Sequence, residues 1–190
     1  FTALRGIAQY PGYFLYDDEN GVPSNEIYSL VQDKQGFIWF GCDAGLYKFD
    51  GVQYLPFKCP SQLSKAITGL TFSTSGKLYC YNFQSQLFLL ENGMLKKLPI
   101  KLQRISKITA DDQHHVYIQH ETGLAVYSEK TKKWRHIHQY GTATAGVFDG
   151  KKTVSLLTQK GVLHCKNTSL NLTPSSLFEQ TGFYMMTRFQ

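Results

Sequence analysis

This chain has few charges, few prolines and no helical pattern. Asp, Glu, Lys and Arg make up 18% of its 190 residues, whereas hydrophobic residues make up 42%. Disordered chains show the opposite balance, so we expect a packed core. Prolines number 6 and glycines 16. No segment places apolar residues at the three- to four-residue spacing of a helix. Together these features predict an all-β protein with many tight turns.

Long hydrophobic runs are also missing. Stretches such as Leu87 to Leu90 are far too short to cross a bilayer, so we expect no direct membrane insertion by this segment. The sequence begins at Phe1 rather than at methionine, which indicates a processed or trimmed product.

Patterns typical of metal sites and nucleophilic catalysis are absent. Cys42, Cys59, Cys80 and Cys165 form no C-x-x-C pair, and buried, strand-embedded thiols are expected. His136 and His138 share a strand face, but no acid or cysteine stands at metal-ligand spacing from them. No G-x-S-x-G motif occurs. We therefore predict no cofactor, no metal and no enzyme activity in this segment.

The net charge of +6 is spread along the chain rather than concentrated. Its densest lysine groups are short: Lys96 with Lys97, three lysines at 130–133, and Lys151 with Lys152. Nucleic-acid binders gather Lys and Arg on one face or in one run, so no nucleic-acid partner is expected. Solvated strand edges and turns account for these lysines.

Internal repeats are the main signal. Short apolar strands open near Gly36, Gly76, His115 and Gly150, at spacings of roughly 40 residues, the period of propeller blades. A second set of anchors follows in the same phase, at Gly45, Gln86, Gly123 and Gly161. Two registers that repeat together indicate one structural unit repeated along the chain.

Each unit reads as four antiparallel strands joined by turns, which is a β-propeller blade. We predict blades at residues 20–57, 67–98, 105–137 and 144–172 within one partial propeller domain, 1–190. Residues 13–16 are predicted to be a ring-closing outer strand, and residues 183–190 the start of a fifth blade. About four blades form too small a ring, so we expect a fragment of a larger, roughly seven-bladed propeller. A homodimer that supplies about eight blades is the alternative.

The first blade carries a longer motif. Residues 20–51 read NGVPSNEIYSLVQDKQGFIWFGCDAGLYKFDG. This stretch resembles the two-component regulator propeller repeat: G-L-P-S-N, an apolar strand, Q-D, G, L-W-I-G-T, G-L, an aromatic residue and D-G. Val22 and Cys42 are mild departures from that pattern. The strong match covers about residues 20–57, and later blades keep the spacing but lack the tryptophan.

The resemblance implies a sensor. Propellers of this kind form the extracytoplasmic, here periplasmic, part of membrane-bound histidine kinases, often hybrid ones, and many respond to oligosaccharides. The implied partners are an oligosaccharide ligand and downstream modules of the same polypeptide. Two other functions stay open. One is a scaffold or dimerisation propeller without a small ligand. The other is a glycan lyase or hydrolase, which would need a close acid pair.

Propellers bind ligands through the loops of one face, around the central channel. Those loops are the turns between second and third strands and the connections between blades. The predicted ligand-binding residues are Asn25, Asp43, Asn82, His120, Glu121 and Gln159, with Tyr10, Lys65 and Tyr140 beside them. Asp33, Asp111 and Asp149 recur in phase and are predicted to cap turns. Trp39 is predicted to lie in the core between blades.

Overall fold

The computed structural model of the chain describes residues 12–137 and, beyond them, four strands at 143–148, 153–158, 161–166 and 169–174. A short 3-10 turn, η1 (Asp18–Asn20), precedes the first strand. Within the described residues, sixteen strands form four sheets, each of four consecutive antiparallel strands. The predicted all-β class of four-stranded antiparallel meanders is confirmed.

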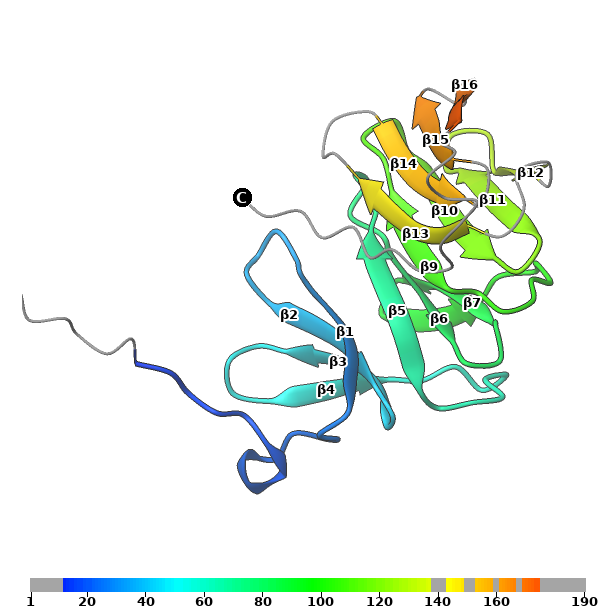
Figure 1. The fold of residues 1–190 in the computed structure, drawn as a ribbon. Coiled ribbons are helices and arrows are strands. Elements are labelled where there is room, and N and C mark those ends of the chain that lie inside the picture. The colour runs from blue at the N-terminus through cyan, green and yellow to red at the C-terminus, as the bar shows by residue number, and fades with distance from the viewer. Residues whose placement is uncertain (1–11, 138–142, 149–152, 159–160, 167–168, 175–190) are drawn as a thin grey trace, which may run out of the picture.

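The four sheets, called blades 1 to 4, follow one another along the chain (Figure 1). Blade 1 contains β1 (Ile27–Gln32), β2 (Ile38–Cys42), β3 (Gly45–Phe49) and β4 (Tyr54–Phe57). Blade 2 contains β5 (Ile67–Phe72), β6 (Leu78–Asn82), β7 (Leu87–Glu91) and β8 (Met94–Lys97). Blade 3 contains β9 (Lys107–Ala110), β10 (His115–His120), β11 (Gly123–Ser128) and β12 (Lys133–Ile137). Blade 4 contains β13 (Ala143–Phe148), β14 (Thr153–Thr158), β15 (Gly161–Lys166) and β16 (Ser169–Pro174).

The first strand of each blade packs against the first strand of the next. β1 contacts β5, β5 contacts β9 and β9 contacts β13, so these strands line the inner side of the array. The contact between blades 1 and 2 is close enough to demand glycine. A Cβ on Gly41 would collide with the carbonyl oxygen of Ile67 and lie 2.7 Å from its Cγ2. Blade 1 therefore rests almost directly on the backbone of blade 2.

Hydrophobic cores fill the spaces between blades. Trp39 of β2 packs with Leu70 and Leu78 of blade 2, as the sequence predicted for this tryptophan. Tyr79 and Leu89 of blade 2 pack in the same way with residues of blade 3. Burying such side chains contributes about 25 cal/mol per Å² of apolar surface, so adjacent blades stabilise one another.

The turn between the first and second strands is built around an aspartate in blades 1 and 3. Asp33 Oδ1 accepts the N–H groups of Gln35 and Phe37, and Asp111 Oδ1 accepts those of Gln113 and His115. The predicted capping role of these two aspartates is confirmed, whereas Asp149 lies outside the described residues.

The second carboxylate oxygen of each aspartate binds an aromatic side chain of its own blade. Asp33 Oδ2 accepts the Trp39 Nε1–H at 2.8 Å, and Asp111 Oδ2 accepts the Tyr117 hydroxyl at 2.8 Å. Blade 2 has Ser73 at this position, and serine offers no carboxylate. Its aromatic residue must find an acidic partner elsewhere.

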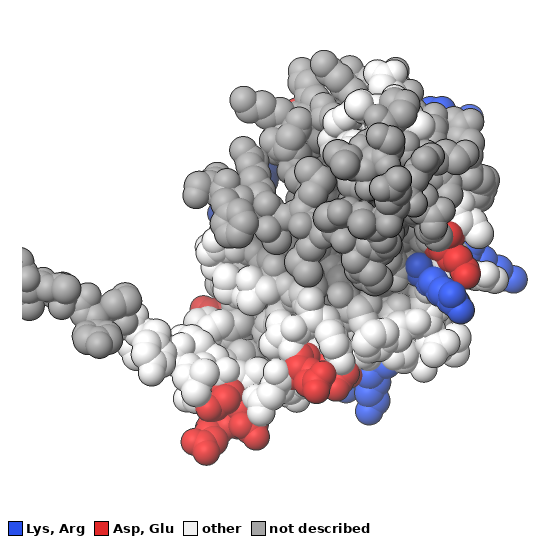
Figure 2. All heavy atoms as spheres, in the orientation of Figure 1, with Lys and Arg blue, Asp and Glu red and all other residues white. Residues whose placement is uncertain are grey.

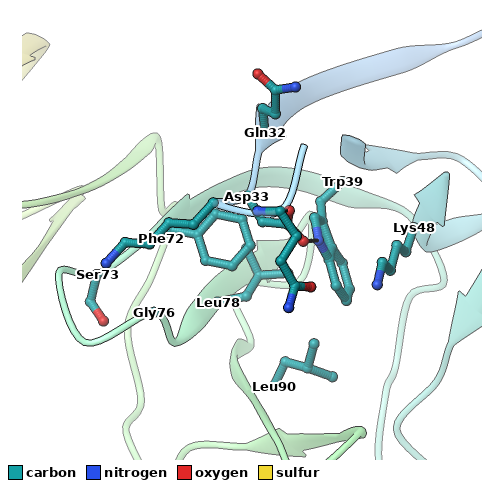
Figure 3. Close-up of a pocket in the computed structure, with 11 residues that line it drawn as sticks. Gln32, Asp33, Trp39, Lys48, Phe72, Ser73, Gly76, Leu78 and Leu90 are labelled. Atoms are coloured by element: carbon teal, nitrogen blue, oxygen red, sulfur yellow. Dashed lines mark hydrogen bonds between the residues drawn. The ribbon is translucent and has the colours of Figure 1, made fainter. Parts of the chain in front are cut away.

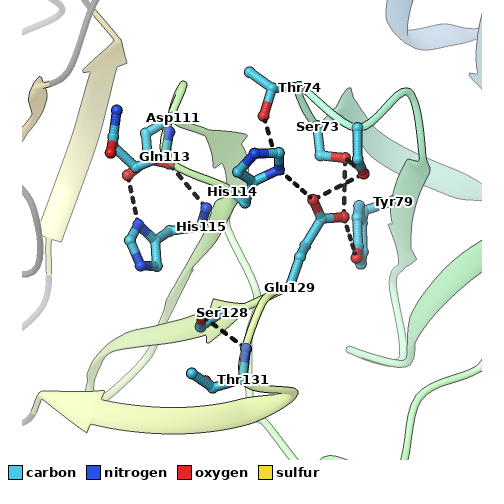
Figure 4. Close-up of polar contacts among 11 residues, drawn as sticks. Ser73, Thr74, Tyr79, Asp111, Gln113, His114, His115, Ser128, Glu129 and Thr131 are labelled. Atoms are coloured by element: carbon cyan, nitrogen blue, oxygen red, sulfur yellow. Dashed lines mark hydrogen bonds and ion pairs between the residues drawn. The ribbon is translucent and has the colours of Figure 1, made fainter.

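That partner is Glu129 of blade 3 (Figure 4). Its buried carboxylate accepts the hydroxyls of Tyr79 (2.8 Å), Ser73 (2.9 Å) and Ser75 (2.8 Å), all from blade 2. His114 Nδ1 lies 3.6 Å from the same group. Burial, and then the bond to Glu129, raise the pKa of Tyr79. One side chain of blade 3 thus supplies the carboxylate that blade 2 lacks.

One face of blade 1 is uncovered in the described part of the chain. Leu30 is 60% exposed, whereas the side chains at the same register position, Leu70 and Ile108, are 5% and 7% exposed. Residues 13–16 pair with none of the described strands, and their side chains are exposed. The segment 183–190 lies outside the described residues, so the predicted fifth blade stays a prediction.

Two further observations concern the described residues alone. None of their helices is long and apolar enough to cross a membrane. Cys42 and Cys80 are buried free thiols, as their place in the second strands predicted.

Candidate ligand-binding site

The predicted ligand-binding residues lie at one end of the blades because strand direction alternates. β2, β6 and β10 end where β1, β5 and β9 begin, so their turns and the connections between blades share one face. Asn25, Asp43 and Lys65 are exposed there. In Figure 2, acidic side chains gather at the lower edge of the molecule, over η1 and the start of β1 as drawn in Figure 1.

A tyrosine draws two carboxylates together on this face. The Tyr28 hydroxyl donates to Asp43 Oδ1 at 2.7 Å and lies 3.4 Å from Glu26 Oε2. The hydrogen bond to Asp43, followed by burial and the two negative charges, raises the pKa of Tyr28 to about 12. The phenol therefore keeps donating its proton to Asp43 beyond the ordinary tyrosine pKa, with Glu26 beside it.

Blade 2 contributes an aromatic ring to the same place. Phe83, in the turn after β6, meets Tyr28 edge-on with ring centroids 5.3 Å apart. Both rings are exposed. We call Glu26, Tyr28, Asp43 and Phe83 the Tyr28 cluster. It offers apolar ring surface beside hydrogen-bond acceptors, the combination that binds the C–H faces and hydroxyls of a sugar.

The other predicted residues have different surroundings. Asn82 is buried, and its amide donates to Ser64 O and Gln86 Oε1 while its oxygen accepts the Gln86 N–H. This side chain braces the loop that leads into blade 2. Glu121 forms an ion pair with Arg104 at 3.2 Å, and His120 is buried in blade 3.

Some predicted positions cannot be placed. Gln159, Tyr10 and Tyr140 lie outside the described residues. Asn25 and Asp43 are thus both exposed on this face, whereas Asn82 has an internal role. In the described part of the chain, no group of three His, Cys, Asp or Glu side chains could hold a metal ion.

Sequence reasoning missed Glu26, Tyr28 and Phe83. The pairing of β1 with β2 shifts register between Ile27 and Ser29, at the position of Tyr28. Such a bulge turns a side chain away from its regular direction. The same shift occurs between Ile67 and Gly69 of blade 2, and both shifts are seen in the strand pairing of the structure.

The chain is similar to known propellers. Residues 21–44 match the family model of the two component regulator propeller. The extracellular domain of a hybrid two component system from B. thetaiotaomicron is similar in fold, with a TM-score of 0.59 and 16% identity. That match covers 78% of this chain and 24% of the other. No curated protein matches the sequence.

Two more structures show how broadly the fold is shared. Another extracellular domain of a B. thetaiotaomicron hybrid two component system has a TM-score of 0.63 and 15% identity, covering 80% of this chain and 22% of that one. Virginiamycin B lyase from Staphylococcus aureus has a TM-score of 0.60 and 13% identity, and the match covers 80% of this chain and 56% of the lyase. At these identities the likeness shows a common fold. This chain spans about a quarter of the two extracellular domains and little more than half of the lyase.

Proposed function

We propose, from the two component regulator propeller repeat at residues 21–44, that this chain is part of an extracytoplasmic sensor propeller. It would bind an oligosaccharide in the periplasm and pass the signal to a histidine kinase encoded outside this segment. The family match is the observation that carries the proposal. The fold likeness to extracellular domains of two component systems agrees with it.

The Tyr28 cluster supports a sugar as the ligand. Aromatic rings from two blades meet there, so a sugar ring could lie against Phe83 or Tyr28 while its hydroxyls donate to Asp43 and Glu26. Each hydrogen bond to a charged acceptor contributes about 1.5–3 kcal/mol. Because blades 1 and 2 both contribute residues to the Tyr28 cluster, a bound sugar would favour one placement of blade 1 relative to blade 2. A shift in that placement is a change that could be passed on to the kinase.

The test is a panel of neutral and acidic oligosaccharides measured by thermal unfolding and titration calorimetry. A ligand at 100 times its Kd stabilises the fold by about 2.7 kcal/mol. For a chain of this size that raises Tm by roughly 5–10 °C. Phe83→Ala should weaken binding about three- to tenfold, the value of one aromatic contact. Phe14→Ala is the matched control, since Phe14 is an exposed aromatic residue outside the Tyr28 cluster. Equal weakening by both variants, or no ligand in the panel, would contradict the proposal.

The uncovered face of blade 1 favours a second function, that of a scaffold. Tyr16, Leu30, Phe40 and Tyr54 help to line an apolar hollow of about 440 Å³ on that face. A second copy of the chain could cover it. Light scattering that shows a concentration-dependent dimer, together with a silent glycan panel, would favour the scaffold. Cleavage of a panel glycan, abolished in Asp43→Asn, would instead favour a glycan-degrading enzyme.

A further inference from the structure

A cleft lies between blades 1 and 2, next to the turns that join the first and second strands (Figure 3). It is therefore at the opposite end of the blades from the Tyr28 cluster. Its volume is about 340 Å³. Trp39 and Phe72 are its aromatic walls, and Leu78 and Leu90 add aliphatic surface. Small-molecule pockets begin at about 300 Å³, so this cleft has room for one ring-sized group.

A positive charge stands over this apolar surface. The Lys48 ammonium lies 3.7 Å from the centroid of the Phe37 ring and 5.6 Å from that of Trp39. Among residues 12–137 it forms no hydrogen bond and no ion pair. Lys34 lines the same cleft. An ammonium that is partly removed from water gains from an anionic partner.

The carboxylate that lines this cleft is already engaged. Asp33 directs one oxygen to two backbone N–H groups and the other to Trp39 Nε1. Burial alone would raise the pKa of Asp33, but these hydrogen bonds and the charge of Lys48 lower it below its ordinary value. Asp33 therefore stays ionised and turned toward its own blade. It balances part of the charge without binding the lysine.

The next interface shows what a carboxylate does in such a place. Between blades 2 and 3, Glu129 reaches across and binds side chains of the neighbouring blade. In blade 2 the position equivalent to Glu129 is Asn92. Glu129 stands two residues after Tyr127, the pairing partner of Val116. Asn92 likewise stands two residues after Leu90, the pairing partner of Leu78. Asn92 is exposed and carries no charge. The interface between blades 1 and 2 thus has no equivalent of Glu129, and it has the cleft instead.

We propose that this cleft binds a small monocarboxylate with an apolar, ring-sized body. The carboxylate accepts hydrogen bonds from Lys48, with Lys34 at the rim adding positive charge. The body lies against the cleft surface that Trp39, Phe72 and Leu90 form together. The ligand would join blades 1 and 2 from the opposite end to the Tyr28 cluster, as Glu129 joins blades 2 and 3.

The experiment uses the indole N–H signals of the ¹⁵N-labelled full chain. The sequence contains 2 tryptophans, so Trp134→Phe assigns the remaining signal to Trp39. Phenylacetate is titrated against its neutral match, phenylacetamide. We expect phenylacetate to shift the Trp39 signal with a Kd on the order of 1 mM, as suits a ligand of this size. Phenylacetamide should bind at least tenfold more weakly, because it has no charge for Lys48.

Variants test the role of the lysine. Lys48→Met keeps most of the length of the side chain but removes its charge. It should bring the ratio of the affinities for phenylacetate and phenylacetamide close to one, whereas Lys48→Arg should retain the preference for the acid. Lys97→Met, at an exposed lysine of β8 that does not line the cleft, is the control and should behave as the unaltered protein. Equal binding of acid and amide to the unaltered protein would overturn the proposal. So would a Trp39 signal that stays still up to roughly 20 mM, well above the expected Kd. Since the acid and amide are compared on the unaltered chain, this result stands even where a variant fails to fold.

Discussion

The shared carboxylate of Glu129 makes a prediction about how neighbouring blades are locked together. Its side chain is 4% exposed and accepts three hydroxyl groups of blade 2. Glu129→Gln keeps the volume and removes the charge. If Glu129 replaces the aspartate that blade 2 lacks, an aspartate placed at position 73 should restore the stability that Glu129→Gln loses.

The magnitude follows from the three hydrogen bonds. A hydrogen bond to a charged group contributes about 1.5–3 kcal/mol, and a neutral one about 0.5–1.5 kcal/mol. The amide nitrogen of glutamine also cannot accept a hydroxyl. We expect Glu129→Gln to lower the free energy of unfolding by about 2–3 kcal/mol. For a chain of this length, that lowers Tm by roughly 5–10 °C.

Ser73→Asp alone should also destabilise, by about 2 kcal/mol, because it places a second carboxylate beside the buried Glu129. In the double variant the new aspartate can take the position that Asp33 holds in blade 1 and accept the Tyr79 hydroxyl. The double variant should therefore be more stable than the sum of the single effects by at least about 1.5 kcal/mol.

The assay is urea unfolding followed by circular dichroism for the four proteins of the cycle. Ser128→Ala, one residue before Glu129 and partly buried, serves as the control for local disturbance of this turn. If the losses of unfolding free energy in the two single variants simply add up in the double variant, Glu129 does not replace the aspartate that blades 1 and 3 have at this position. A Glu129→Gln protein as stable as the parent would refute the hydrogen-bond arithmetic itself.

Three further predictions concern single sites. Gly41→Ala should cost at least about 2 kcal/mol in urea unfolding, because its Cβ would collide with the backbone of Ile67 and force blades 1 and 2 apart. Asp43→Asn should move the titration of Tyr28, followed by phenolate absorbance, down from about 12 toward the ordinary tyrosine value. A raised pKa means that Tyr28 contributes stability below pH 10 and loses it as the pH rises toward 12, so this alkaline loss should shrink in Asp43→Asn. The pKa of Asp33 is lowered in the folded protein, so Asp33 contributes to folding stability at pH values above 3.8, the ordinary pKa of an aspartate. That stability is lost as the pH falls below 3.8. The stability difference between the parent and Asp33→Asn, measured by acid unfolding, should narrow over that range; a constant difference would contradict the sign.

Much of the fold could be predicted because its signals are local. A strand alternates its side chains every two residues, and a turn needs an aspartate or a glycine at a set place. These preferences act within a few residues and repeat with the blades. The capping of turns by Asp33 and Asp111 and the burial of Trp39 follow from them.

The candidate site was predicted less well because its parts come from different blades. From the sequence, Asp43 is predicted to be a ligand-binding residue because it is polar and lies in a turn between a second and a third strand. Its meeting with Tyr28 depends on a bulge, and the contact of Tyr28 with Phe83 depends on how blade 2 lies against blade 1. Asn82 occupies an equally polar turn position, but loop packing buries its amide among backbone and side-chain partners.

The sequence by itself determined the strands, their turns and the four-fold repetition, since each depends on neighbours along the chain. Only the tertiary structure decided which side chains meet between blades. Ser73 looks like an ordinary turn residue until Glu129, 56 positions later, supplies its carboxylate. Contacts of that kind depend on the angle and distance at which two sheets pack, and those are set by the whole core between them.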